Sequence, residues 1–362
     1  MTTPDRSAIE KALAACVDPD LDRDYLSAGC VSSIDIDDGH VRIRLRMGYP
    51  LATVMEERAR TVRECVEAVA GVERASVVID WEVAAGQVQA GAERLDAVKN
   101  IIAVASGKGG VGKSTVAANL ALALQAEGAS VGVLDADIYG PSQPRMLGIE
   151  GRPSSADGQT LEPLEGHGLQ IMSIGFLVDP ENPMIWRGPM VTQALEKMLY
   201  NTRWRKLDYL VVDLPPGTGD IQLTLAQKVP LAGSIVVTTP QDIALIDARK
   251  GLKMFEKVAV PTLGLVENMS THVCSQCGHV EPIFGEGGGA RMAEDFGVRL
   301  LGQLPLTLSI REQSDGGLPT VIADPDSEAA ATFRQIARRA TARLSGSGAL
   351  PQGFPNVRIV DD

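Results

Sequence analysis

Two stretches of this sequence combine residue types and spacings that could do chemistry. The first, SGKGGVGKST at residues 106–115, fits the spacing G-x-x-x-x-G-K-[ST] from Gly107 to Ser114. Closely spaced glycines let backbone N–H groups point into one concavity at the start of a helix, where phosphate oxygens can bind. Lys113 would reach the β- and γ-phosphates and Ser114 would bind Mg²⁺. The stretch therefore predicts a site for ATP and magnesium.

The predicted nucleotide contacts include the whole loop and the first residues of the helix after it. They are Gly107, Lys108, Gly109, Gly110, Val111, Gly112, Lys113, Ser114 and Thr115.

The second stretch, ENMSTHVCSQCGHV at residues 267–280, places Cys274 and Cys277 two residues apart with His272 and His279 on either side. Such a pair is open to three interpretations: a zinc site, a seat for an iron-sulfur cluster, or redox-active or structural thiols. The four possible zinc ligands fall within eight residues, so a zinc site in one chain would need a very tight loop.

Polar residues with possible roles follow three apolar segments further along the chain. Asp135 and Asp137 lie in VLDADIYGPSQP, Asp213 and Gly217 in VVDLPPGTGD, and Asn268 in VENM. Each group comes at the carboxyl end of a predicted strand, which is where open parallel sheets bind their ligands. We therefore expect these side chains to meet near the glycine-rich loop.

The elements that must position these residues begin near Asn100, where short apolar strands alternate with helical stretches. Fully apolar strands separated by helices indicate a parallel sheet covered on both faces. The predicted strands are IIAVAS, VGVLDA, LQIMSI, YLVVDL, SIVVTT, TLGLVE and RLLGQL. The fold class is thus α/β, a doubly wound, mostly parallel sheet whose last helix is ATFRQIARRATARL.

The N-terminal part predicts a separate small α+β domain. A helix over residues 5–17 precedes two alternating strands, VSSIDI and VRIRLRM, joined by the turn Asp38-Gly39. A helix from about Thr53 to Val69 and the strand SVVIDWEV complete an α-β-β-α-β unit. We expect domains at 1–85 and 99–345, a linker at 86–98 and a flexible tail at 346–362.

Composition and charge exclude several classes of function. The net charge is -12 with no run of five Lys or Arg, which argues against nucleic acid as a partner. The apolar runs are strand-sized, far below the roughly 18 residues of a membrane span, and the N-terminus lacks the apolar core of a signal peptide. We therefore expect a cytoplasmic protein without a membrane partner.

The five cysteines do not form a disulfide framework, because their number is odd and three of them are scattered. Cys16, Cys30 and Cys65 are expected to be small core residues.

Lys108 directly follows the first glycine of the loop and gives KGGVGKST. This run resembles the deviant Walker A motif of the family that includes Min and Par partitioning ATPases, nitrogenase iron protein, arsenite-pump ATPases and Mrp/ApbC-type iron-sulfur carriers. In that family the early lysine crosses a dimer interface to the nucleotide of the other subunit. The resemblance therefore implies a homodimer in which Lys108 acts on the partner's site.

The same resemblance implies roles for the residues at the strand ends. Asp137 would orient the attacking water and support the metal shell, whereas Asp135 is expected to be structural. Asp213 would hold Mg²⁺ through water, the N–H of Gly217 would sense the γ-phosphate, and Asn268 would bind adenine. The implied catalytic residues are Lys108, Lys113, Asp137 and Asp213, and the implied magnesium ligands are Ser114, Asp137 and Asp213.

The segment ENMSTHVCSQCGHVEPIFGEGGG resembles the Mrp/ApbC branch. In that branch a CxxC holds a [4Fe-4S] cluster between two subunits, so Cys274 and Cys277 of each chain would supply its four thiolates and His272 and His279 would be bystanders. The N-terminal unit resembles the MIP18-like (DUF59) domain. It departs from that pattern at Tyr49-Pro50, where stand-alone domains carry a reactive Cys-Pro, and this puts a cluster role for the N-terminal unit in doubt.

The resemblance thus implies a slow ATPase that binds an iron-sulfur cluster and transfers it to apoproteins, with an upstream assembly scaffold as a further partner. The alternative is a partitioning or positioning ATPase of the Min/Par type with a structural zinc at the CxxC. The acidic net charge and the tail PNVRIVDD, which has no amphipathic stripe, argue against the surface-binding parts that such an ATPase needs.

Overall fold

The computed structural model describes residues 4–89, 92–178, 188–274 and 276–347. The described residues form two compact units, one of the described residues up to Ala84 together with those from Thr341 to Ser347, and one of those from Ala85 to Ala340. The last helix, α11 (Glu328–Ser347), therefore begins in the second unit and ends in the first. The tail predicted for residues 346–362 lies outside the described residues from 348 onward.

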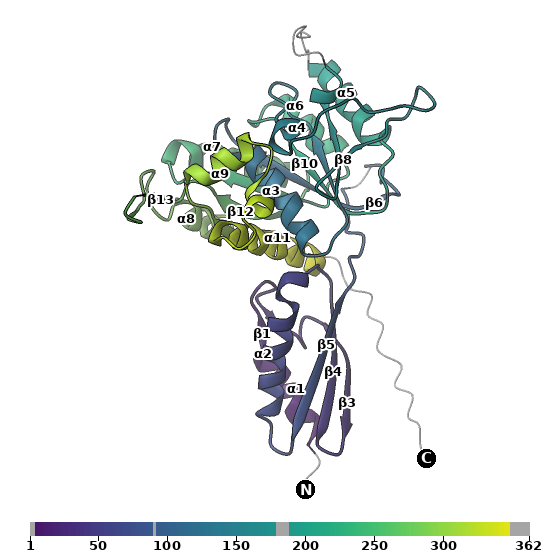
Figure 1. Cartoon of the computed structure of the whole chain (residues 1–362), viewed down its shortest axis with the longest axis vertical. Coiled ribbons are helices and arrows are strands. Elements are labelled where there is room, and N and C mark those ends of the chain that lie inside the picture. The colour runs from purple at the N-terminus through teal and green to yellow at the C-terminus, as the bar shows by residue number, and fades with distance from the viewer. Residues whose placement is uncertain (1–3, 90–91, 179–187, 275, 348–362) are drawn as a thin grey trace. The chain divides into compact units, whose positions relative to one another are not determined.

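The N-terminal unit has the predicted α-β-β-α-β order, with two short additions (Figure 1). Its three-stranded sheet has the order β3-β4-β5, in which β3 and β4 are antiparallel and β4 and β5 are parallel. The elements are α1 (Arg6–Ala15), β1 (Val17–Asp18), β2 (Arg23–Asp24), β3 (Val31–Asp37), β4 (His40–Met47), η1 (Ala52–Val54), α2 (Met55–Glu67) and β5 (Arg74–Trp81).

The alternation of β4 determines which face of this sheet is buried. Its apolar residues enter the core and its arginines are exposed, as a half-buried strand requires. The buried set is Val41, Ile43, Leu45 and Met47. Asp38 and Gly39 both have positive φ, which is the conformation of a tight hairpin turn.

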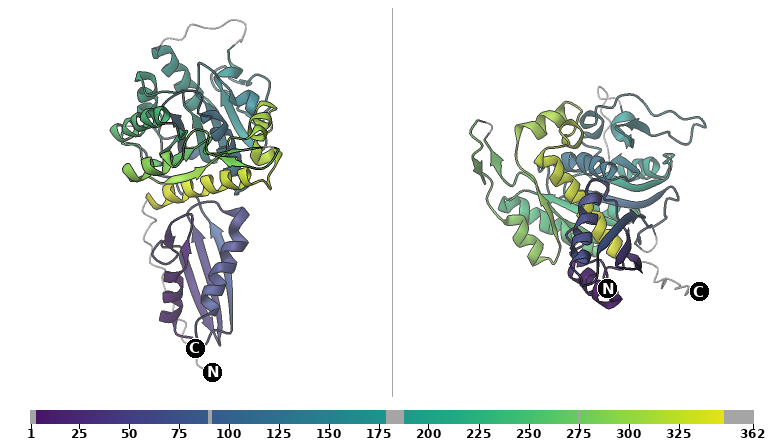
Figure 2. Two further views of the ribbon diagram at one scale, coloured as in Figure 1. Left: turned by 90° about the vertical axis from the view of Figure 1, so that its left-hand side faces the viewer. Right: turned by 60° about the horizontal axis from the view of Figure 1, so that its bottom comes forward.

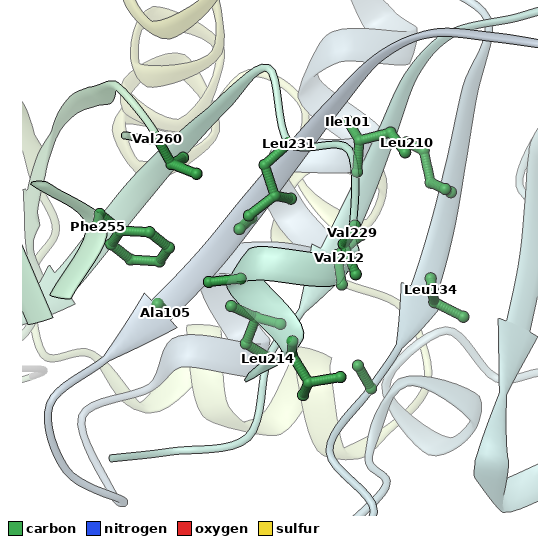
Figure 3. Close-up of a cluster of buried hydrophobic side chains, with 14 of the residues drawn as sticks. Ile101, Ala105, Leu134, Leu210, Val212, Leu214, Val229, Leu231, Phe255 and Val260 are labelled. Atoms are coloured by element: carbon green, nitrogen blue, oxygen red, sulfur yellow. The ribbon is translucent and has the colours of Figure 1, made fainter. Parts of the chain in front are cut away.

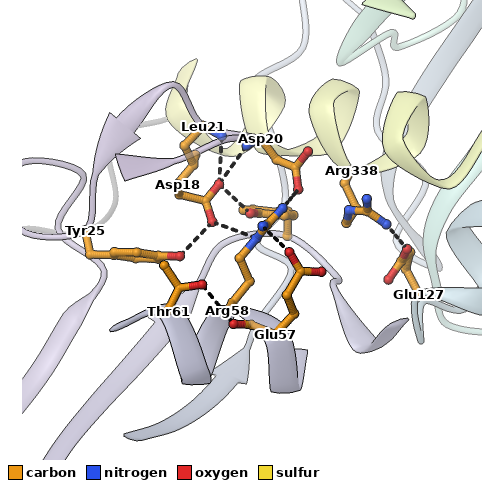
Figure 4. A network of polar contacts seen from close by, with 10 residues as sticks. Asp18, Asp20, Leu21, Tyr25, Glu57, Arg58, Thr61, Glu127 and Arg338 are labelled. Atoms are coloured by element: carbon orange, nitrogen blue, oxygen red, sulfur yellow. Dashed lines mark hydrogen bonds and ion pairs between the residues drawn. The ribbon is translucent and has the colours of Figure 1, made fainter. Parts of the chain in front are cut away.

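A buried polar cluster joins the loop after α1 to α2 (Figure 4). The Asp18 carboxylate accepts hydrogen bonds from the hydroxyls of Tyr25, at 3.1 Å, and Tyr49, at 2.9 Å. Arg58 forms ion pairs with Asp18 and Asp20. Burial, with the nearby Asp18 charge, raises the pKa of Tyr49, so its hydroxyl stays protonated and donates. Tyr49 thus has a structural role at the position where a reactive cysteine would stand.

The second unit is built on an eight-stranded sheet of order β15-β12-β11-β6-β10-β7-β9-β8 (Figures 1 and 2). All seven predicted strands form and run parallel, so the predicted doubly wound α/β fold is confirmed. They are β6 (Val98–Ser106), β7 (Val131–Asp135), β9 (Leu169–Ser173), β10 (Leu207–Asp213), β11 (Gly233–Thr238), β12 (Thr262–Glu267) and β15 (Leu300–Gln303).

Three short strands were not predicted. The edge strand β8 (Leu164–Gly166) is antiparallel to β9. The hairpin β13 (His272–Val273) and β14 (Val280–Glu281) flanks the two neighbouring cysteines and stands apart from the main sheet.

Helices cover both faces of the main sheet. Buried side chains of α5 to α8 share one hydrophobic core with the strands, whereas α3 and α11 pack on the other face. Figure 3 shows part of that core, with Leu210 and Val212 of β10 near Leu134 of β7. The helices are α3 (Lys113–Ala126), α4 (Gln143–Met146), η2 (Ile174–Phe176), α5 (Gly188–Tyr200), α6 (Asp220–Lys228), α7 (Asp242–Lys257), α8 (Gly288–Asp295), α9 (Leu308–Asp315) and α10 (Thr320–Ala323).

Gly86 and Gln89, in the segment 86–98 that the sequence predicts as a linker, are hydrogen-bonded to the second unit, and residues 90 and 91 of that segment lie outside the described part. The Gln89 amide donates hydrogen bonds to the carbonyls of Ala226, at 2.7 Å, and Val229, at 2.8 Å. The Gly86 N–H donates to the Asn100 side chain at 2.8 Å. The sequence of this segment correctly shows no apolar face for a core. It does not show that the segment is attached to the second unit by hydrogen bonds.

Candidate functional site

The glycine-rich loop joins β6 to α3, as a phosphate-binding loop requires. Gly112 caps α3 with a φ of +82°, and a Cβ there would lie 2.1 Å from Nδ2 of Asn268. A Cβ on Gly107 would lie 2.2 Å from the backbone carbonyl of Asp247 in α7. Glycine is thus needed at both positions because a neighbouring atom leaves no room for a Cβ. Gly112 in addition has a backbone conformation that favours glycine.

Lys113 lies at the centre of a group of buried polar side chains. Its ammonium forms ion pairs with Asp213 Oδ1 and, at 3.5 Å, with Asp137 Oδ2, and it lies 3.2 Å from Ser114 Oγ. These residues come from α3 and from the ends of β7 and β10, as the sequence predicted for a shared strand-end site.

Burial and mutual repulsion make it unfavourable for the carboxyl groups of Asp135, Asp137 and Asp213 all to be ionised at once. Burial, together with the Asp213 charge, raises the pKa of Asp135 to about 7. Burial also raises the pKa of Asp137, although Lys113 opposes this effect. Asp135 accepts hydrogen bonds from the Ser173 hydroxyl and the Gln143 N–H, which fits the structural role expected for it.

The chemistry of this donor set fits magnesium. Hydroxyl and carboxylate oxygens are the ligands that Mg²⁺ prefers, and with nucleotides it takes one or two protein groups and completes its shell with phosphate and water. Ser114, Asp137 and Asp213 supply such oxygens within contact distance of the lysine that would bind phosphate. Among the residues that the structure describes, no three His, Cys, Asp or Glu side chains are grouped to hold a metal by themselves.

Asn268 and Gly217 lie beside the loop, but both are hydrogen-bonded within the chain. Asn268 Nδ2 donates to the Val111 carbonyl at 2.9 Å, and its Oδ1 accepts from the Met269 N–H at 3.0 Å. The N–H of Gly217 donates to the Ser106 carbonyl at 2.9 Å. Binding adenine or γ-phosphate, as the sequence predicts, would require these bonds to exchange partners.

The two neighbouring cysteines occupy the turn between β13 and β14. The Cys274 N–H donates to the His279 carbonyl at 2.9 Å, and the Cys274 carbonyl accepts from the Gly278 N–H at 2.9 Å. Backbone N–H groups, that of Cys277 first, lower the pKa of the Cys274 thiol. Cys277 is exposed. His272 directs its Nδ1 toward the Leu306 carbonyl at 3.3 Å.

Sequence reasoning missed a buried acidic residue at the strand end that precedes this hairpin. Glu267, the last residue of β12 and the neighbour of Asn268, is buried. Its carboxylate accepts hydrogen bonds from the Gly289 N–H at the start of α8 and from the Gln303 amide at 2.6 Å. No sequence pattern marks this contact, because the glycine partner contributes only its backbone.

Gln143 was also missed, although it stands only eight residues after Asp135 in the same motif. Its side chain is fully buried and contacts the magnesium-binding candidates. A glutamine after a proline-serine turn resembles an ordinary helix-starting residue, so its position in the sequence gives no signal.

Comparison with known families decides the class of this fold. A family model described as NUBPL iron-transfer P-loop NTPase matches residues 97–341. The chain belongs to this family. A second model, described as iron-sulfur cluster assembly protein, matches residues 6–77 and covers the N-terminal unit. Both resemblances inferred from the sequence are confirmed.

Relatives of this chain in other organisms carry consistent names. The chain is 61% identical over 267 residues to an iron-sulfur cluster carrier protein of Escherichia coli, covering 74% of this chain and 72% of the relative. It is 46% identical over 351 residues to the Haemophilus influenzae protein of the same name, covering 97% and 95%. It is also 51% identical over 255 residues to the mouse iron-sulfur cluster transfer protein NUBPL, covering 70% and 80%.

Among solved structures, this chain is similar to a nucleotide-binding protein from Archaeoglobus fulgidus in complex with ADP. The two share 36% identity with a TM-score of 0.57, over 65% of this chain and 92% of the other. No helix in the described ranges is long and apolar enough to cross a membrane.

Proposed function

We propose that this protein is a nucleotide-dependent carrier that binds a [4Fe-4S] cluster and transfers it to apoproteins. The observation that carries the proposal is the connection of two sites through one strand end. Asn268, which directly follows β12, contacts the phosphate-binding loop, and the hairpin that carries Cys274 and Cys277 begins a few residues later at His272. The names of the relatives support the same function.

The nucleotide would bind along the loop from Gly107 to Thr115. Lys113 would leave Asp213 and Asp137 to bind the β- and γ-phosphates, and the side chain of Ser114 would turn to the metal. Mg²⁺ would supply positive charge beside the phosphates, replacing the ammonium charge that now lies between the two carboxylates. Asp137 would orient the attacking water, since it is less buried than Asp135 and Asp213.

We infer a homodimer for two reasons. Each chain offers two neighbouring thiols, whereas a [4Fe-4S] cluster takes four, so two chains together complete the set. Ile243 and Ile246 on the first turns of α7 are 70% and 56% exposed, next to the helix position that Gly107 contacts. A second copy of the chain that covers these side chains would bring its Lys108 toward this nucleotide site.

The cargo would be held by the turn that carries Cys274 and Cys277. A thiol with a lowered pKa is a better metal ligand, because the thiolate is the form that binds. The exposure of Cys277 leaves the cluster within reach of an acceptor protein. Transfer needs a labile cluster, so this exposure fits a carrier better than a structural metal site.

Hydrolysis is proposed to act as a slow switch between two arrangements of the dimer rather than as a source of rapid turnover. Partners are an upstream assembly scaffold and apoprotein clients in the cytoplasm, with no role for nucleic acid, given the net charge of -12. A Min/Par-type positioning ATPase with a structural zinc is the alternative, and the iron-transfer family match favours the carrier.

Anaerobic cluster transfer tests this proposal. Reconstituted protein should activate an apo-enzyme that requires a [4Fe-4S] cluster, in the presence of a chelator that captures released iron. Cys277→Ser should abolish the activation, and Lys113→Ala should keep the cluster but lose the dependence of transfer on ATP. Activation by the Cys277→Ser protein at the wild-type rate would contradict a carrier function of the turn.

A further inference from the structure

Gln143 makes an unusual set of contacts at the nucleotide site. It is the first residue of α4, and its side chain is completely buried. Its Nε2 donates to the Ser114 carbonyl at 3.0 Å and to Asp213 Oδ2 at 2.8 Å. Its backbone N–H donates to Asp135 Oδ2 at 3.1 Å. One glutamine thus connects the loop, the end of β7 and the end of β10.

The orientation of the Gln143 amide is determined by these contacts. Both hydrogens of Nε2 point at acceptors, so a flipped amide would place its oxygen against a carbonyl and a carboxylate. Oε1 is buried and forms no hydrogen bond with any described residue. Buried polar atoms are nearly always paired, so an acceptor of this kind beside a ligand site indicates that a bound molecule donates to it.

We propose that Gln143 is a positioning residue for the magnesium of the bound nucleotide. This inference rests on the proposed nucleotide function. Oε1 accepts a hydrogen bond from a water molecule in the Mg²⁺ shell, because Mg²⁺ keeps several waters when it binds with phosphates and each bound water is a donor. Lys113 cannot take this role, since an ammonium group only donates.

The hydrogen bond from Gln143 Nε2 to Asp213 also determines which oxygen of that carboxylate can face the metal shell. Nε2 of Gln143 donates a hydrogen bond to Oδ2 of Asp213, whereas Oδ1 of Asp213 contacts Lys113. Oδ1 is therefore the oxygen that becomes available when Lys113 turns to phosphate. Gln143 holds the carboxylate in the orientation that presents Oδ1 to the metal shell.

The proposed role can be tested by calorimetric titration with ADP, once with excess EDTA and once with excess Mg²⁺. The quantity to compare between variants is the gain in ADP affinity that Mg²⁺ produces. Gln143→Met keeps length and apolar volume but loses both functions of the amide, and Gln143→Asn keeps the amide but withdraws it by one methylene. In both variants the gain from Mg²⁺ should fall about tenfold, as loss of a hydrogen bond to a polarised group implies. Affinity in EDTA should change little.

Gln170→Met is the matched control. Gln170 is another glutamine of the second unit whose side-chain amide forms two hydrogen bonds. Its partners are the backbone N–H and carbonyl of Arg205. This variant should keep the full gain from Mg²⁺. Thermal unfolding of each ligand-free variant checks that it is folded, and Gln143→Asn, the smaller change, carries the test if Gln143→Met does not fold.

Three outcomes would overturn the inference. An equal loss of affinity with and without Mg²⁺ would show that Gln143 only supports the loop. An unchanged gain in both variants would show that Oε1 does not serve the metal shell. No gain from Mg²⁺ in a wild-type protein that binds ADP would also overturn it, whereas a wild-type protein that does not bind ADP would overturn the proposed nucleotide function as well.

Discussion

Lys113 contacts the same carboxylates that the proposed function assigns to magnesium. Its side chain is buried, as are those of Asp213 and Asp137. A buried carboxylate without a partner is expensive, so an ammonium group at this position stabilises the site. The lysine therefore has a structural role in addition to the phosphate-binding role that the sequence predicts.

Replacing Lys113 by Ala should accordingly affect stability as well as nucleotide binding. Breaking a buried ion pair by removing one partner costs about 3–5 kcal/mol, and urea unfolding should show a loss of this size. Lys253→Ala, on the exposed side of α7, is the control and should unfold as the wild type does. Equal stability of the two variants would contradict the assigned role.

The cysteines should differ in reactivity because their surroundings differ. Burial raises the pKa of both Cys16 and Cys30 to about 12, whereas backbone N–H groups lower the pKa of Cys274 from its ordinary value of 9.0. The thiolate is the reactive form. In iron-free protein, iodoacetamide should therefore modify Cys274 first and leave Cys16 and Cys30 intact until unfolding. Mass spectrometry of the alkylated peptides measures this, and uniform labelling would refute it.

At the residue scale, the sequence predicted the residues that carry motifs and missed those that act through geometry. Lys113 was predicted because its type and spacing indicate phosphate binding, and the roles of Asp137 and Asp213 were implied by the family resemblance of the segments that carry them. Gln143 and Glu267 were missed because their roles depend on which backbone and side-chain atoms they meet in the folded chain.

The phosphate-binding loop and α7 approach each other so closely that only glycine fits at one position between them. Gly107 has no room for a Cβ because of the Asp247 carbonyl, whereas nothing lies within 4 Å of a Cβ on Gly346 in α11. Gly107→Ala should displace the loop or the helix and weaken nucleotide binding by at least about tenfold. Gly346→Ala should bind nucleotide nearly as the wild type does. Similar affinities of the two variants, measured by ADP titration, would show that the close approach does not hold the loop.

At the scale of elements, apolar strands of the sheet were predictable because burial on both faces gives continuous hydrophobic runs. The hairpin β13–β14 was not, because each strand has only two residues and so carries no alternation. Strand β8, with three residues at the sheet edge, was missed for the same reason.

The division into two units predicts how the chain responds to truncation. Residues Ala85–Ala340 contain a core of their own, and Gln89 ties the start of this segment to the unit. A chain that begins at Ala85 should therefore fold and bind ADP with nearly full affinity. The end of α11 should lose order, because Ala342 belongs to the core of the N-terminal unit. Gel filtration and ADP titration test this, and aggregation or loss of binding would contradict it.

At the scale of the whole molecule, the sequence predicted two folded parts from the change in their strand patterns. It described the segment between them only as lacking a core pattern. The hydrogen bonds of Gln89 to backbone carbonyls leave no trace in a hydrophobic pattern, so the attachment of this segment could not be predicted.

The central claim is that two chains share one iron-sulfur cluster through Cys274 and Cys277. The most direct measurement is an anaerobic count of iron, sulfide and zinc on the reconstituted protein, combined with its mass in solution. We expect about four irons for every two chains. This iron should be found in the dimer fraction and should be lost in both Cys274→Ser and Cys277→Ser. One zinc in each chain, retained by monomers and lost when His272 or His279 is replaced, would contradict it.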